Sequence, residues 1–143
     1  MTTVDFYINV ADRERTACRL AGKAAAQGRR MFVLVADPAA AERLDRLLWT
    51  WPATAFVPHC MDADPLAPET PVLIGLQPQA APEGAVLLNL SGACPPGFER
   101  YERVLEIVST DEEDRRLARA RYARYREHGC AIRTHDLGAK SGA

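Results

Sequence analysis

The sequence predicts an α/β fold in which helices cover both faces of a mostly parallel sheet. Short apolar runs rich in β-branched residues recur along the chain, and segments with helical spacing of apolar residues stand between several of them. Strands that alternate with helices imply crossover connections, which place neighbouring strands parallel. With 143 residues, 48% of them hydrophobic, the chain is long enough to bury one core without metal or disulfide support. We therefore predict one α/β domain over residues 1–137 and a flexible tail over residues 138–143.

The predicted strands are short segments dominated by apolar, β-branched or aromatic side chains. They comprise residues 4–10, 31–35, 56–58, 72–74, 85–90 and 103–108, with a last strand at residues 131–134. The run over residues 31–35 is apolar without interruption, which is typical of a strand buried on both faces of a parallel sheet.

Three helices are predicted from their start and stop signals. The first covers residues 12–27, with Asp12 as the N-cap and Gly28 as the C-terminal stop. The second begins at Asp37-Pro38 and ends before Pro52. The third begins with a capping box formed by Thr110 and Glu113, and Gly129 ends it.

Charge is distributed unevenly along the chain. The formal net charge is −1, which argues against a generally basic nucleic-acid-binding protein. The predicted third helix nevertheless carries six arginines and no acid between residues 115 and 126: Arg115, Arg116, Arg119, Arg121, Arg124 and Arg126. The rest of the chain is correspondingly acidic, so the positive field is local to this helix.

Three of these arginines and a tyrosine share one stripe of the helix. Arg115, Arg119, Tyr122 and Arg126 are spaced by four, three and four residues, which places them in a narrow sector. A solvated helix face is one explanation, but such faces usually mix both signs of charge. Guanidinium groups beside an aromatic ring suit carboxylate recognition, so we favour an acidic peptide, or phosphates, as the ligand.

No catalytic, cofactor or metal site is predicted. The turn over residues 9–13 has no glycine and carries Asp12, so it is not a nucleotide-binding loop. We interpret the three histidines as ordinary surface or capping residues and Ser91-Gly92 as a turn. The four cysteines are scattered, and the fragment His59-Cys60 has no second ligand pair, so reduced thiols without metal are expected. The absence of a leader and of a long apolar stretch predicts a cytoplasmic protein.

Both tryptophans lie at the predicted end of the second helix and in the loop that follows. Trp49 and Trp51 stand beside Pro52, where complete burial is harder than in the middle of a helix. Residue types alone leave two alternatives open: a partner interface, or rings that seal the edge of the core.

Several short motifs, in their order along the chain, resemble the chi subunit of bacterial DNA polymerase III. They are Asp5-Phe6-Tyr7, Arg43-Leu44-Asp45, Leu48-Trp49, Phe56-Val57-Pro58-His59, Pro71-Val72-Leu73-Ile74, Leu117-Ala118-Arg119, Arg121-Tyr122 and Tyr125-Arg126. The resemblance covers most of the chain. It implies a Rossmann-like three-layer fold without nucleotide activity.

The resemblance also implies two partners. Chi-type proteins bind a psi subunit, which tethers them to the clamp-loader complex, and Trp49, Pro52 and Phe56 match the surface that faces psi. They also bind the acidic, phenylalanine-ended tail of the single-stranded-DNA-binding protein. The tail-binding residues implied here are Arg115, Arg119 and Tyr122, with Arg124 and Arg126 as basic neighbours. Ala123 departs from the family pattern, in which a basic residue often stands there.

The expected function is therefore that of a non-catalytic adaptor in DNA replication, which contacts DNA only indirectly. A small α/β enzyme, or a protein that binds a phosphorylated ligand through the arginines, is the alternative. Direct binding of nucleic acid by the same helix is a third option, which the acidic remainder of the chain disfavours.

Overall fold

One parallel sheet of seven strands organises the part of the chain that this computed structural model describes, residues 2–50 and 57–138. Its strands are β1 (Thr3–Val10), β2 (Met31–Leu34), β3 (His59–Met61), β4 (Val72–Gly75), β5 (Val86–Asn89), β6 (Arg103–Ser109) and β7 (Ala131–Asp136). They are ordered β3-β4-β2-β5-β6-β1-β7, and every pairing is parallel. The predicted Rossmann-like α/β fold is confirmed, with a sheet that is wholly rather than mostly parallel.

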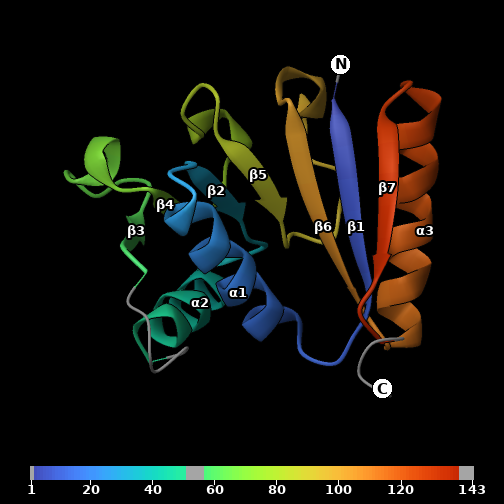
Figure 1. Ribbon diagram of the computed structural model, residues 1–143, viewed down its shortest axis with the longest axis horizontal. Helices are drawn as coiled ribbons and strands as arrows, with labels where there is room; N and C mark the ends of the chain where they lie inside the picture. Colours follow the sequence, from blue (N-terminus) through green and yellow to red (C-terminus); the bar gives the residue numbers. More distant parts are fainter. Residues whose placement is uncertain (1, 51–56, 139–143) are drawn as a thin grey trace.

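Helices lie on both faces of this sheet, as Figure 1 shows. They are α1 (Arg13–Ala26), α2 (Pro38–Thr50) and α3 (Glu112–Glu127). Short 3-10 helices lie between α2 and α3 in the sequence: η1 (Ala67–Glu69), η2 (Pro78–Ala80) and η3 (Phe98–Arg100). Helices α1 and α2 pack on one face against residues such as Val33 and Ile107. Helix α3 packs on the other face, where Tyr125 meets Phe6 and Phe98. Two apolar cores therefore sandwich the sheet.

The start and stop signals of the first helix behave as predicted. The carboxylate of Asp12 accepts a hydrogen bond from the backbone N–H of Arg15 at 3.0 Å, so Asp12 is the N-cap of α1. Gly28 has φ of 71°, a left-handed conformation that glycine adopts without steric cost.

The third helix begins one residue later than the predicted capping box. Asp111 is the N-cap of α3, and its carboxylate accepts from the backbone N–H of Asp114 at 3.0 Å. Asp114 in turn accepts from the backbone N–H of Ser109 at 2.7 Å. The predicted Thr110–Glu113 box is therefore wrong: two aspartates accept from the N–H groups of Asp114 and Ser109, and Glu113 pairs with Arg116 instead.

The third strand is displaced from its predicted position. Residues 57 and 58 are not in a strand, and residue 56 lies outside the described residues. Pairing begins at His59, opposite Val72. The prediction followed the apolar residues, but the register of the neighbouring β4 selects a more polar segment.

Residues 139–143 of the predicted tail lie outside the described residues. Gly138 is described, and it lies so close to Asn9 that an added Cβ would come within 2.7 Å of the Asn9 Cβ. Among the described residues, no helix has the length and apolar character that crossing a membrane requires.

Candidate functional site: an apolar pocket under the arginine helix

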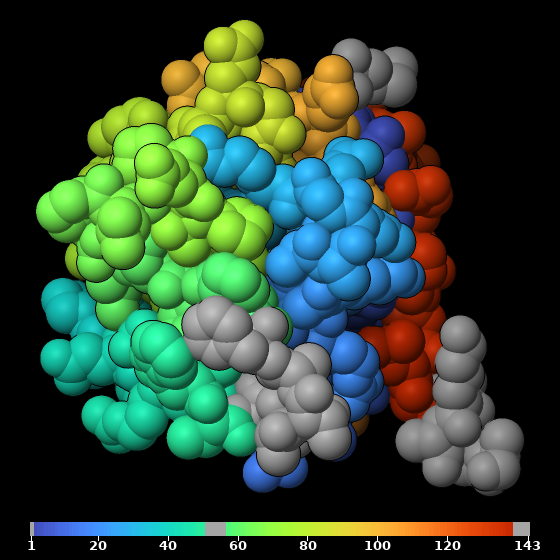
Figure 2. All heavy atoms as spheres, turned by 60° about the vertical axis from the view of Figure 1, so that its left-hand side comes forward, coloured from blue at the N-terminus to red at the C-terminus, as the bar shows by residue number. Residues whose placement is uncertain are grey.

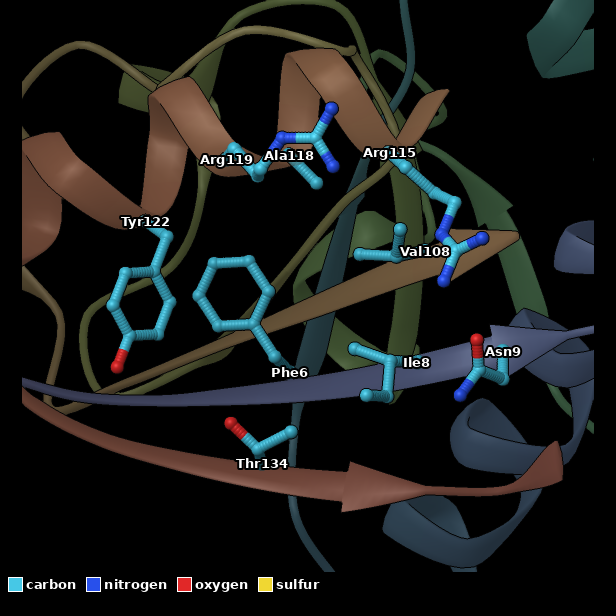
Figure 3. A pocket seen from close by; sticks show the side chains of 9 residues that line it. All are labelled: Phe6, Ile8, Asn9, Val108, Arg115, Ala118, Arg119, Tyr122 and Thr134. Atoms are coloured by element: carbon cyan, nitrogen blue, oxygen red, sulfur yellow. The ribbon is translucent and has the colours of Figure 1, made fainter. Parts of the chain in front are cut away.

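A pocket of about 250 Å³ lies between α3 and the sheet. Figure 3 shows its lining, which comes from β1, β6, α3 and β7: Phe6, Ile8, Asn9, Val108, Arg115, Ala118, Arg119, Tyr122 and Thr134. Side chains alternate along a strand, so Phe6 and Ile8 both face α3. The pocket therefore forms where one face of β1 meets the flank of the helix that carries the arginine stripe.

The floor of the pocket is apolar. Phe6, Val108 and Ala118 are buried, and they present hydrocarbon to the cavity. The Tyr122 ring packs against Phe6 with 5.5 Å between ring centroids and remains 39% exposed. Figure 3 shows the two rings side by side at one end of the pocket. An apolar group that entered here would meet both rings.

Two arginines stand at the rim. Arg115 and Arg119 project from successive turns of α3, and in Figure 3 the Arg115 side chain extends toward Asn9. Arg115 lies 3.6 Å from the carboxylate of Glu112, in a solvent-exposed pair. Within the described part of the chain, no ion pair holds Arg119, which is exposed. The pocket thus combines an apolar floor with guanidinium donors at its mouth.

Six arginines stand in a segment without acids, but the expectation that they lack acidic partners is wrong for three of them. Arg115 and Arg116 have partners in the preceding turn, Glu112 and Glu113. Arg121 is only 3% exposed and is buried in an ion pair with Glu106. Glu112 and Glu113 lie in the first turn of α3, before the run of arginines, and Glu106 lies on β6, so all three acids are outside the segment in which the sequence shows no acid.

The remaining two predicted arginines do not line the pocket. Arg126 continues the stripe one turn beyond Tyr122. Arg124 lies two residues after Tyr122, about 200° around the helix axis, and its side chain is exposed on the other flank. Of the predicted tail-binding set, the structure brings together Arg115, Arg119 and Tyr122.

A buried polar network fixes the rotation of α3 against the sheet. The Glu106 carboxylate accepts from Arg121 Nε at 3.0 Å, from Asn89 Nδ2 at 2.9 Å and from the Tyr125 hydroxyl. Arg121 also donates to the carbonyl of Gly92 at 3.0 Å. Burial raises the pKa of Glu106, against the opposing effect of Arg121 and the other donors. Burial and the nearby Glu106 raise the pKa of the Tyr125 hydroxyl.

Several pocket and network residues were not predicted from the sequence. Two of them, Phe6 and Val108, are apolar strand residues that do not differ from their surroundings in the sequence. The third, Glu106, interrupts an apolar strand with a charge. The available signal was the single acid within the apolar run 103–108, because a charge at a buried strand position requires a partner.

Trp49 lies at the end of α2, on the opposite face of the sheet, and is 60% exposed. Its ring meets the His59 ring edge-on at 5.1 Å. Figure 2 shows the teal surface of α2 adjoining the green surface of the segment that contains β3. Pro52 and Phe56, which were predicted for the same surface, lie outside the described residues.

The histidines have more structure than predicted. The His59 side chain is fully buried, with Nε2 at 3.1 Å from the Asp45 carboxylate and Nδ1 at 2.6 Å from the carbonyl of Val57. The prediction of a surface or capping role is therefore wrong for His59. His135 bonds to the buried Asp5, whereas His128 bonds to the carbonyl of Arg124, as expected of a residue at a helix end.

The described ranges include the segment Ser91-Gly92 and the side chains that could ligate a metal. Ser91 donates to the Asn89 side chain at 2.6 Å, and Gly92 has φ of 88°, so Ser91-Gly92 is a turn, as predicted. No three side chains of the metal-binding types gather among the described residues. The thiols of Cys18, Cys60, Cys94 and Cys130 are free.

Comparison with known proteins gives one consistent family. The sequence model described as "DNA polymerase III chi subunit, HolC" matches residues 1–133. DNA polymerase III subunit chi of Pseudomonas aeruginosa is 35% identical over 141 residues, which cover 96% of this chain and 98% of that protein. The same subunit of Escherichia coli K12 is 30% identical over 134 residues, with 93% and 89% coverage. That of Haemophilus influenzae is 26% identical, with 95% and 98% coverage. The chain therefore belongs to the DNA polymerase III chi subunit family.

Proposed function

We propose that this chain is a cytoplasmic, non-catalytic adaptor that links the clamp-loader complex to single-stranded-DNA-binding protein during replication. Membership of the chi family, whose named relatives are subunits of DNA polymerase III, supports a role as a replication accessory subunit. A psi-type subunit is the proposed link to the clamp loader. The acidic C-terminal tail of single-stranded-DNA-binding protein is the proposed second partner.

The pocket under α3 carries the tail-binding part of the proposal. A chain end that is acidic and finishes in phenylalanine has one ring and several carboxylates to place. The apolar floor of Phe6, Val108 and Ala118 suits the ring. Arg115 and Arg119 at the rim suit the carboxylates, because a guanidinium can bind two oxygens at once.

Trp49 carries the psi part of the proposal. An exposed tryptophan is a frequent interface anchor, since it buries much area with little loss of side-chain entropy. Helix α2 and the pocket lie on opposite faces of the sheet. Two partners bound at these places would not compete for the same surface, which is what a linking subunit requires. Pro52 and Phe56 belong to the proposed interface through the family resemblance.

The Arg119→Ala variant tests the tail site. Loss of a charge-assisted hydrogen bond should weaken binding of a labelled tail peptide by about 1.5 to 3 kcal/mol. Fluorescence anisotropy against wild type measures this, and binding should weaken as salt rises. A peptide with an amidated C-terminus should also bind less tightly, because one carboxylate is gone.

Arg124→Ala is the matched control. It removes the same group from the same helix, but on the flank that does not line the pocket, so its affinity should stay within a few-fold of wild type. Equal affinities for Arg119→Ala and wild type would remove Arg119 from the site. Thermal stabilisation by nucleotides or phosphate, with no peptide binding, would favour the alternative of an enzyme or phosphate-binding protein.

A further inference from the structure

A second charged surface lies on the face of the sheet opposite the pocket. A groove of about 120 Å³ runs between the C-terminal half of α1 and strands β1 and β6. Lys23, Arg29 and Arg103 line it together with Gln27 and Tyr7, and no carboxylate is part of this lining. Lys23 and Arg29 are exposed. Among the described residues Lys23 and Arg29 form no ion pair, and cations without a partner in a groove concentrate anions there.

The basic surface continues from the groove to the edge strand β7, because Arg103, Arg133 and His135 all bond to one buried carboxylate, that of Asp5. Asp5 is fully buried and accepts from Arg103 Nε at 2.9 Å, from Arg133 at 2.8 and 3.0 Å and from His135 Nε2 at 2.9 Å. Burial raises the pKa of Asp5, but the hydrogen bonds from Arg133, His135 and Arg103 outweigh it and hold the pKa at about 2. Asp5 is therefore ionised at neutral pH, and it orients two guanidinium groups while neutralising only one of them.

An aromatic pair stands beside these cations. The His135 ring stacks on Tyr7 with 4.8 Å between centroids and 18° between planes. The His135 side chain is 42% exposed and the Arg133 side chain 58% exposed. In Figure 1, α1 and α2 lie over other strands of this face, and no described helix crosses β1 or β7 there. The rings and cations thus share one accessible surface.

We propose that this surface, from Lys23 and Arg29 through Arg103 to Arg133 and His135, binds the backbone of single-stranded nucleic acid. The surface carries four cationic side chains and one carboxylate, that of Asp5. Such an excess of positive charge suits a ligand with several phosphates better than a ligand with one negative charge. The exposed His135 ring provides a place for an unpaired base to stack. The bases of a duplex are already paired and stacked on one another, so they would not use this ring. Phe6 and Ile8 alternate with Asp5 and Tyr7 along β1, so this surface backs onto the peptide pocket and is separate from it.

The Lys23→Ala/Arg29→Ala double variant tests the proposal. Both side chains are on the surface, so the fold should persist, which circular dichroism checks. The probe is a labelled 20-nucleotide oligo-dT, titrated by anisotropy from 50 to 200 mM salt. Wild type should bind with a dissociation constant on the order of 10⁻⁵ M at 50 mM salt. The double variant should bind at least about fivefold more weakly, and its log-log salt slope should be shallower by roughly 1.4, since each contact to a single strand contributes about 0.7.

The control is Arg124→Ala/Arg126→Ala, which removes the same charge from α3 and should leave the slope unchanged. The proposal is overturned if wild type does not bind at 50 mM salt, or if both double variants weaken binding equally. Tighter binding of a duplex of the same length would overturn it, as would displacement of the strand by an acidic peptide at equal charge. Tail-peptide affinity should be unchanged in Lys23→Ala/Arg29→Ala, so failure here is distinguishable from failure of the proposed adaptor function.

Discussion

Replacing Glu106 by glutamine removes the charge of a buried carboxylate and keeps its size. Glu106 accepts from Arg121, Asn89 and Tyr125, and all three partners are donors. The new amide would turn one acceptor atom into a donor that faces another donor. Arg121, at 3% exposed, would keep its charge with only neutral acceptors in this network, the amide oxygen and the Gly92 carbonyl. Breaking one side of such a buried pair costs about 3 to 5 kcal/mol of unfolding free energy.

Urea unfolding followed by circular dichroism measures this loss. With an m-value of about 2 kcal/mol/M, the midpoint should fall by about 1.5 to 2.5 M. Glu113→Gln is the matched control, because Glu113 also pairs with an arginine but both side chains are 63% exposed. Its midpoint should stay within experimental error, as for most surface pairs. A loss below about 1 kcal/mol for Glu106→Gln would refute the view that Arg121 depends on this charge.

Two further predictions concern Asp5 and Trp49. The folded pKa of Asp5, about 2 against an ordinary value of 3.8, should contribute about 2 kcal/mol of stability. Because the folded pKa is depressed, this contribution is present above about pH 4 and is lost as pH falls toward 2. Urea unfolding measured from pH 6 to pH 2 should show this loss of stability, and the Asp5→Asn variant should not show it. An identical pH dependence in both proteins would contradict this. Trp49→Ala should abolish co-purification with a psi-type subunit while the circular dichroism spectrum is retained. If the variant is unfolded instead, Trp49 has a structural role in the core and not a role in the interface.

Most elements were predictable because their signals are local. The uninterrupted apolar run of β2 indicates burial on both faces, and Asp12 and Gly28 bound α1 by capping chemistry that acts within a few residues. Strand β3 was misplaced because His59–Met61 has no strand pattern of its own. This segment forms a strand because β4 leaves one edge free for pairing. That edge exists only in the folded sheet, so the local sequence gives no sign of it.

The candidate site was predictable only from the helix side. The spacing of Arg115, Arg119 and Tyr122 places them on one stripe, and the structure agrees. Phe6, about 110 residues earlier in the chain, completes the pocket, and no local pattern links it to α3. Arg121 has the same residue type as the exposed arginines of α3, and only the position of Glu106 on β6 distinguishes it as the buried one.

The position of β1 between β6 and β7 has a consequence for the order of folding during translation. Strand β1 hydrogen-bonds to β6 and β7, which are encoded about 100 and 130 residues later. At usual elongation rates this means a delay on the order of ten seconds. Throughout that interval the apolar side chains of β1, Val4 and Phe6 among them, have no native neighbour strand. The native hydrogen bonds of β1 can therefore form only after β6 and β7 have emerged.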